Sequence, residues 1–170
     1  MYRVAVHQDT NWDWRTFDLD RDVALADDKV GYIDAVDPDL SAFEKRGGKL
    51  LIYHGWGDGG ARGSISPLNT INYYSSVLDK MGPRQNTWMR LFMVPGMAHC
   101  GGGPGPNQFD MLSALERWKE AGAAPDQVIA SRMKDNQVDM TRPLCPYPQV
   151  AVYNGKGNTN EASSFACKTK

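Results

Sequence analysis

The amino-acid sequence predicts an α/β fold with a mostly parallel sheet. Predicted helices and short apolar runs alternate from about residue 37, in the order helix, strand, helix, strand, helix, strand. Each apolar run is bounded by glycine, proline or polar residues, and each helix has recognisable residues at its start and its end. Alternation of this kind is typical of proteins in which helices connect neighbouring parallel strands.

Residues 1–36, which we expect to lead into this α/β part, carry a weaker pattern. Residues 1–7 could form a short strand, and the aromatic, polar stretch after them has no clear period. Asp18 is a candidate N-cap for a helix in DLDRDVALADDKVGYIDA. The loose apolar stripe of that helix consists of Val23, Leu25, Ala26 and Val30.

Residues 37–133 are expected to form the α/β core. A first helix begins near Asp37 or Asp39 and ends at Gly47, and the apolar run KLLIYHG after it predicts a buried strand. Ser66 suits the N-cap of a second helix, in SPLNTINYYSSVLDKM, because a proline follows it at the first helical position. The second buried strand is predicted in TWMRLFMVPG.

A third helix and a third strand complete the predicted core. DQVIASR is a further short strand, and residues 134–170 form a tail of mostly loop with proline, asparagine and glycine. The helix lies in NQFDMLSALERWKEAG, and its predicted apolar face consists of Phe109, Leu112, Leu115 and Trp118.

The composition argues against two classes of partner. The 170 residues have a formal net charge of -1, with basic and acidic residues mixed along the chain. We expect no nucleic-acid partner and no membrane partner, because binding to either surface relies on concentrated positive charge. No apolar stretch approaches the roughly 20 residues of a membrane-spanning helix. No signal peptide is recognisable in the first residues, MYRVAVHQDTNWDW.

The three cysteines favour an oxidising compartment. Cys145 and Cys167 flank a tail with few core-forming residues, and a disulfide commonly holds such a segment in place. The alternative is a pair of unpaired thiols in a cytosolic protein. If the two are paired, Cys100 is left over and suggests a partner elsewhere.

Asp58 and His99 follow two successive predicted strands. Active residues of open parallel sheets collect beyond the carboxyl ends of the strands. Because a single helix connects these two strands, we expect them to be neighbours. An aspartate that accepts a hydrogen bond from a histidine fixes its tautomer and stabilises the imidazolium formed in proton transfer. The order also matches the last two members of a Ser, Asp, His triad. The alternative is that Asp58 is a turn residue and His99 a surface loop residue.

A nucleophile for such a triad is absent from the sequence. No G-x-S-x-G occurs; Ser64 and Ser66 are better explained as a loop hydroxyl and a helix N-cap. The run GGGPGP lacks the lysine and the serine or threonine of a phosphate loop, so we expect it to be a flexible connection.

A zinc site is a competing interpretation of the same loops. His54, Asp58, His99 and Cys100 could converge, but their spacings fit no zinc motif. We therefore expect no metal at these residues. His7 is expected to lie at the surface or in a strand, without a role.

Five long segments carry more information together than any single motif: DPDLSAFEKRGGKLLIYHGWGD, ISPLNTINYYSSVL, LFMVPGMAHCGGGPGPNQFD, ALERWKEAGAAPDQVIASR and RPLCPYPQVAVYNGKGNTNEASSFAC. In this order they resemble the tannase and feruloyl esterase family of secreted α/β-hydrolases. The likeness covers about Asp37 to Cys167 and is weaker before that. The resemblance implies the last strands and helices of an α/β-hydrolase, which is a partial fold.

The resemblance also implies roles for individual residues. Asp58 is then the triad aspartate, His99 the triad histidine, and Cys100 one half of a disulfide to the residue before the nucleophilic serine. Cys145 and Cys167 match the cysteines of the family's tail bridge. DGGARGSISP is longer between Asp58 and Ile65 than the family's usual link, with Arg62 at its tip.

The expected activity is that of a carboxylic ester hydrolase on small phenolic esters: galloyl, feruloyl or related aromatic esters. The serine, its cysteine, the oxyanion-hole donors and the lid with the family's calcium site would all lie upstream, in an amino-terminal half that this chain lacks. We expect the chain itself to need no cofactor, and the protein to be secreted or periplasmic. The alternative is a binding or interaction module that retains half of a hydrolase fold and does not catalyse.

Overall fold

The computed structural model describes residues 1–59 and 65–169. The chain divides into two compact units, Met1–Asp37 and Pro38–Lys170. Arg62, Ser64 and most of the longer connection after Asp58 lie outside the described residues. Within the described ranges, no helix has the length and the apolar character needed to cross a membrane.

The first unit consists of short helices. They are η1 (Tyr2–Val6), η2 (Trp14–Thr16), α1 (Leu19–Val30) and η3 (Gly31–Ile33). The strand predicted for residues 1–7 is wrong, because the backbone forms the local hydrogen bonds of a helix instead. The amide of His7, for example, donates to the Tyr2 carbonyl at 2.8 Å. A strand needs a neighbour to satisfy its backbone groups, and in the described part of this unit no strand is formed.

Asp18 caps helix α1, as predicted, and Asp22 completes the cap. The Asp18 carboxylate accepts from the Arg21 amide at 2.8 Å, and Asp22 Oδ2 accepts from the Asp18 amide at 2.8 Å. Asp22 is fully buried, Arg21 Nε donates to it at 2.9 Å, and His7 Nε2 lies 3.4 Å from it. The Arg21 hydrogen bond is the main cause that lowers the pKa of Asp22 to about 2.

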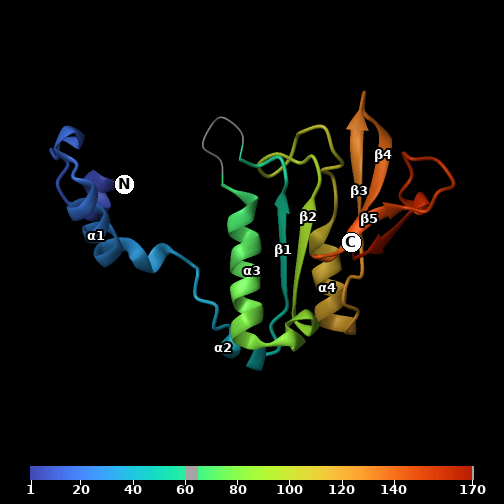
Figure 1. Cartoon of the computed structure of the whole chain (residues 1–170), viewed down its shortest axis with the longest axis horizontal. Helices are drawn as coiled ribbons and strands as arrows, with labels where there is room; N and C mark the ends of the chain where they lie inside the picture. Colours follow the sequence, from blue (N-terminus) through green and yellow to red (C-terminus); the bar gives the residue numbers. More distant parts are fainter. Residues whose placement is uncertain (60–64, 170) are drawn as a thin grey trace. The chain divides into compact units, whose positions relative to one another are not determined.

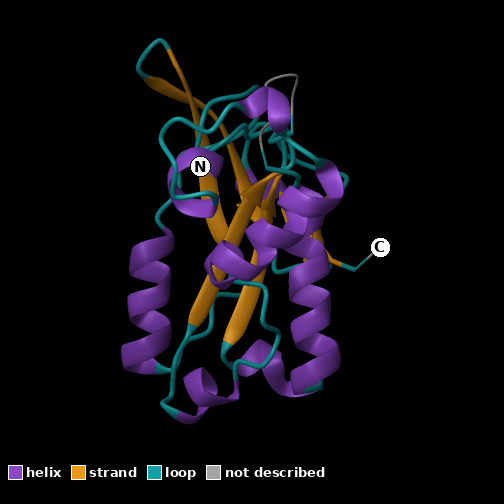
Figure 2. Ribbon diagram, turned by 90° about the vertical axis from the view of Figure 1, so that its left-hand side faces the viewer, coloured by secondary structure: helices purple, strands orange, loops and turns teal. Residues whose placement is uncertain are grey.

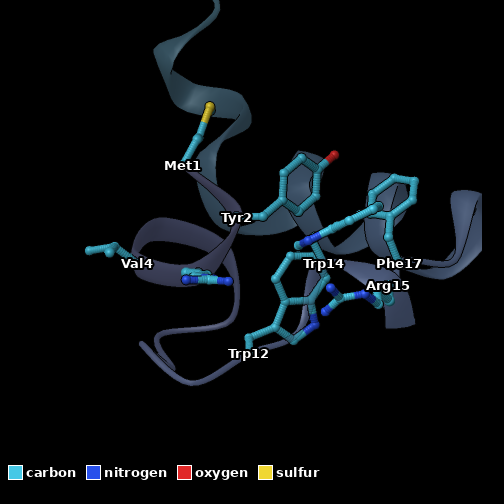
Figure 3. A pocket seen from close by; sticks show the side chains of 8 residues that line it. Met1, Tyr2, Val4, Trp12, Trp14, Arg15 and Phe17 are labelled. Atoms are coloured by element: carbon cyan, nitrogen blue, oxygen red, sulfur yellow. The ribbon is translucent and has the colours of Figure 1, made fainter.

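Aromatic side chains pack together at the amino-terminal end of this unit. His7 stacks on Trp12 with ring centroids 4.4 Å apart, and Tyr2 meets Phe17 edge to face at 5.2 Å. Figure 3 shows Tyr2, Trp12 and Phe17 around an open cavity of about 820 Å³, which Trp14 and Arg15 also line. His7 therefore belongs to an aromatic cluster rather than to a strand.

A parallel pair of strands forms the centre of the second unit. Strand β1 (Leu50–Gly55) pairs with β2 (Met89–Val94) in continuous register, from Leu50 opposite Met89 to Gly55 opposite Val94. Figure 1 shows the two strands side by side with their carboxyl ends together, and Figure 2 shows helices on both sides of them. The predicted α/β order of elements is therefore confirmed for this core.

Strand β2 divides the core into two clusters. Phe92 and Val94 pack with helix α4 (Met111–Ala121), whereas Leu91 and Met93 pack with helix α3 (Pro67–Met81). Alternate residues of a strand point to opposite faces, so both faces of β2 are covered. Burial on both faces explains why this strand reads as an unbroken apolar run.

The helix ends differ in detail from the sequence prediction. Helix α2 (Ser41–Lys45) is shorter than expected, and Asp39 rather than Asp37 accepts from the Ser41 amide at 3.0 Å. Ser66 occupies the N-cap position of α3, but its side chain makes no capping hydrogen bond. Asp110 caps α4 by accepting from the Ser113 amide at 2.9 Å.

The predicted apolar face of α4 is partly wrong. The helix begins at Met111, so Phe109 precedes it, and Leu112 is 66% exposed. The buried positions are Met111, Ala114 and Trp118. These positions have the spacing of one helical face.

The third predicted strand pairs in the opposite direction from our expectation. Strand β3 (Val128–Lys134) forms an antiparallel hairpin with β4 (Gln137–Leu144). Asp135 and Asn136 connect them with positive φ angles of 50° and 61°. Such a two-residue turn joins antiparallel strands, whereas a parallel partner needs a long crossover.

The carboxyl-terminal tail contains more strand than predicted. Besides β4, it forms an antiparallel pair of β5 (Val150–Tyr153) and β6 (Phe165–Lys168). A disulfide joins Cys145 to Cys167. The amide of Tyr147 donates to the Leu91 carbonyl at 2.7 Å, which attaches this segment to the edge of β2.

Acid should loosen the first unit through Asp22. Its pKa is lowered from 3.8 to about 2, so its contribution to stability is present above about pH 4 and is lost as the pH falls toward 2. The amide NMR signals of folded α1 should lose intensity as the pH falls from about 4 to about 2. Asp22→Asn should not show this pH-dependent loss. Asp22→Asn should instead be destabilised already at neutral pH.

Asp20→Asn is the matched control, because Asp20 lies in the same first turn of α1. It should behave like the wild type over the whole range. An unchanged acid response in Asp22→Asn would contradict the role assigned to this carboxylate.

Removing the tail disulfide should destabilise the second unit. The bridge closes a loop with a sequence separation of 22, and constraining a loop of this size in the unfolded chain is worth about 3 kcal/mol. The double variant Cys145→Ala, Cys167→Ala should therefore unfold at a lower urea concentration. Cys100→Ser, at an exposed position, should keep the wild-type midpoint; equal midpoints for all three proteins would refute the prediction.

Candidate active site

The two parallel strands bring Asp58 and His99 to the same edge of the sheet. Asp58 follows the end of β1 at Gly55, and His99 follows the end of β2 at Val94. Because Gly55 and Val94 are register partners, the loops after them begin side by side. Figure 1 shows both loops at the same end of the strand pair.

Asp58 and His99 are hydrogen bonded to each other. His99 Nδ1 lies 2.7 Å from Asp58 Oδ2. An ionised carboxylate only accepts, so the proton of this bond belongs to Nδ1, which leaves Nε2 as the free nitrogen of the neutral ring. The side chain of Asp58 is 4% exposed and that of His99 is 58% exposed. The buried Asp58 carboxylate thus orients the solvent-exposed imidazole of His99.

Two glycines before Asp58 permit this close approach. The Gly57 amide donates to the Met97 carbonyl at 2.8 Å, and a Cβ added to Gly57 would lie 2.8 Å from that oxygen. A Cβ on Gly55 would collide with the Met97 carbonyl and lie 2.7 Å from the Ala98 oxygen. The sequence HGWGD therefore lets the loop after β1 run against the backbone that carries His99.

The glycines after His99, which we expected to form a flexible connection, lie in a turn next to the end of the β2 loop. The Ala98 amide donates to the Gly102 carbonyl at 3.2 Å. Gly103 has a φ of +86°, and a Cβ there would collide with the Gly96 carbonyl. The glycine run thus folds back on the backbone of Gly96 and Ala98, just before His99.

Cys100 follows His99 in an unusual backbone conformation. Its φ is 57°, which costs a residue with a side chain roughly 1–2 kcal/mol. The thiol is exposed and has no disulfide partner within the described residues. The other two predicted cysteines, Cys145 and Cys167, are bonded to each other in the tail.

His54 joins the pair of residues at the site. Its Nε2 lies 3.2 Å from Asp58 Oδ2, and its Nδ1 lies 2.7 Å from Thr70 Oγ1. The sequence suggested His54 only as a metal ligand, because its position late in a buried strand gave no other reason to select it. Within the described ranges, no group of three or more histidine, cysteine or acidic residues is arranged to hold a metal ion.

A shallow cavity of about 120 Å³ opens at these residues. Its walls include His54, Asp58, His99 and Cys100. Ligand sites commonly measure about 300–1,000 Å³, so this cavity accommodates only a small part of a ligand. A second open cavity, of about 450 Å³, is lined by Arg142 and by mostly apolar residues of the tail and the β2 loop, and no histidine, aspartate or cysteine is among its described lining residues.

The sequence matches known esterases. The family described as tannase and feruloyl esterase matches residues 1–168. Over 136 residues, the chain is 46% identical to a mono(2-hydroxyethyl) terephthalate hydrolase of Piscinibacter sakaiensis, covering 78% of this chain and 22% of that protein. Over 187 residues, it is 34% identical to a probable feruloyl esterase B-2 of Aspergillus terreus, covering 98% of this chain and 34% of that protein.

The structure matches as well. The crystal structure of feruloyl esterase B from Aspergillus oryzae superposes with a TM-score of 0.84 at 32% identity, covering 98% of this chain and 36% of that one. The chain therefore spans between about a fifth and about a third of the length of these relatives. This likeness confirms the predicted partial α/β-hydrolase fold. The chain belongs to the tannase and feruloyl esterase family.

Proposed function

We propose that this chain supplies the aspartate and the histidine of a Ser–His–Asp triad in a carboxylic ester hydrolase. The observation that carries the proposal is the 2.7 Å hydrogen bond between the buried Asp58 carboxylate and the exposed His99 imidazole. This arrangement presents a basic nitrogen, Nε2, to a reacting group while the carboxylate fixes the tautomer. Family membership and the names of the relatives support ester hydrolysis as the reaction.

The proposed reaction proceeds through an acyl-enzyme. His99 Nε2 takes the proton of the serine hydroxyl as its oxygen attacks the ester carbon, and then gives that proton to the departing alcohol. Water next enters, loses a proton to the same nitrogen and releases the acid, and the proton returns to the serine. Asp58 stays ionised and holds the imidazolium in place. The serine belongs to the part of the full-length protein that lies outside these 170 residues.

Cys100 is proposed to bridge to the cysteine beside that serine. The exposed thiol and the left-handed backbone at this position support the idea, since they place the sulfur next to His99 and outside the core. A bridge there would hold the base and the nucleophile in register although they are far apart in sequence. Catalysis of this kind depends on positioning to within about an ångström.

The proposed substrates are small phenolic esters, such as galloyl, feruloyl or related aromatic esters. The cavity of about 120 Å³ at His99 is too small for such a molecule, which supports a binding pocket completed by the amino-terminal half of the full-length protein. The oxyanion-hole donors and the calcium site of the family are proposed to lie in that half. The tail disulfide supports a secreted or periplasmic location.

Grafting tests the catalytic roles. This chain replaces the corresponding carboxyl-terminal part of the Aspergillus oryzae feruloyl esterase B, and hydrolysis of methyl ferulate is measured. We expect the chimera to be active, His99→Ala to lower kcat/KM by more than about 1,000-fold, and Asp58→Asn by about 100- to 10,000-fold.

His7→Gln is the control for replacing a histidine, since His7 lies in the first unit, and it should retain activity within about twofold. Near-wild-type turnover by a folded His99→Ala chimera would exclude His99 as the base. A folded chimera without activity would favour the alternative, a binding module that has retained the fold.

Alkylation tests the proposed partner of Cys100. In the 170-residue chain, Cys100 should react with iodoacetamide without reductant, whereas Cys145 and Cys167 should react only after reduction and unfolding. In the active chimera, non-reducing peptide mapping should find Cys100 joined to the cysteine before the serine. A bond from Cys100 to either tail cysteine, or a free Cys100 in the active chimera, would contradict the proposed bridge.

A further inference from the structure

His54 lies late in strand β1, opposite Met93 of β2. Its side chain is 12% exposed, compared with 47% for the whole of the preceding Tyr53. Tyr53 points to the other face of the strand, where its ring meets Phe109 edge to face at 5.2 Å. His54 is therefore directed toward Thr70 of helix α3, on the side where the Asp58 carboxylate lies.

The contacts of His54 determine which of its nitrogens carries the proton. Nε2 faces two acceptors, Asp58 Oδ2 at 3.2 Å and the Ile65 carbonyl at 3.3 Å. In the neutral ring the proton therefore lies on Nε2, and Nδ1 accepts from the Thr70 hydroxyl at 2.7 Å. His54 thus presents a donor to the same carboxylate oxygen that accepts from His99.

We propose that His54 is a positioning residue, which holds the Asp58 carboxylate so that Oδ2 faces His99 Nδ1. The hydrogen bond from His99 and the N–H of His54, whose nitrogen lies 3.2 Å from Oδ2, together oppose rotation of the carboxylate about its terminal bond. Thr70 in turn holds the ring of His54. Asp58 Oδ2 thus lies between His54 of strand β1 and His99 of the loop after β2, and Thr70 links His54 to helix α3. The inference rests on the proposed function, because it concerns the same triad.

The consequence is a preference for one tautomer of His99. A carboxylate held at 2.7 Å from Nδ1 keeps the proton on that nitrogen and leaves Nε2 basic. Without the donor of His54, the carboxylate samples other orientations, and His99 moves toward the tautomer of free imidazole, with the proton mainly on Nε2. His54 then affects turnover through His99 rather than through substrate binding.

Nitrogen-15 NMR of histidine-labelled chain tests this directly, and the chain contains only three histidines. We expect protonated Nδ1 in wild-type His99. His54→Leu, which fills similar space without a donor, should shift His99 toward protonated Nε2. His54→Gln, whose amide can donate from about the same place as Nε2, should retain the wild-type signal.

Thr70→Val is a second variant, because it leaves His54 in place and removes the hydroxyl that holds its ring. It should produce a smaller shift in the same direction, and it allows the test even if His54→Leu fails to fold. An unchanged His99 signal in a folded His54→Leu chain, or in Thr70→Val when only that variant folds, would overturn the proposal. A wild-type His99 without a protonated Nδ1 would overturn it too.

The active chimera adds a kinetic readout. There, His54→Leu should lower kcat by about 10- to 100-fold with little change in KM, and His54→Gln should restore most of the loss. A tautomer shift in the 170-residue chain together with an inactive chimera would uphold the positioning role and reject the hydrolase. An active chimera in which His54→Leu changes neither the His99 tautomer nor kcat would uphold the hydrolase and reject the positioning role.

Discussion

The parallel pairing of β1 with β2 is the constraint on which the site depends. Its register places Gly55 opposite Val94, and the loops that leave these residues carry Asp58 and His99. Strand β2 is buried on both faces, between α3 and the layer formed by α4 and the β3–β4 hairpin. A strand held in this way cannot slip relative to its neighbour without exposing core residues. The packing of the strands elsewhere in the unit therefore sets the 2.7 Å distance between His99 Nδ1 and Asp58 Oδ2.

Glycine is needed for different reasons in the two loops: close approach of the backbone before Asp58, and positive φ angles after His99. Before Asp58, Gly55 and Gly57 are required because the opposing backbone lies where a Cβ would be. After His99, Gly102 and Gly103 adopt φ angles of 66° and 86°, which residues with a Cβ rarely adopt. Cys100 takes a similar angle without being glycine. Side chains are thus absent at Gly55, Gly57 and Gly103, where a Cβ would meet the opposing backbone, whereas Cys100 beside the histidine adopts a positive φ despite its side chain.

The sequence was sufficient to predict that Asp58 and His99 lie close together, because strand order and loop position follow from local patterns. It was not sufficient to predict that His54 contacts Asp58, since the contacts of a residue inside an apolar strand depend on the strand register and on the neighbouring helix. The β3–β4 hairpin was missed although Asp135 and Asn136 are typical turn residues. The alternating order of helices and strands predicts a mostly parallel sheet, whereas β3 pairs with β4 in the antiparallel direction. Leu112 was misplaced because the predicted face used a spacing of three residues throughout, whereas the buried residues Met111, Ala114 and Trp118 follow spacings of three and four.

The two halves of the site differ in exposure. In the inner half, Asp58 contacts Nδ1 of His99 and His54 lies beside Asp58, and the side chains of Asp58 and His54 are only 4% and 12% exposed. The outer half consists of the exposed part of the His99 ring and the exposed Cys100. An imidazole that is anchored on one side and open on the other is suited to accept a group from outside the chain. The exposed side of the His99 ring is therefore the side from which the proposed nucleophile would have to approach.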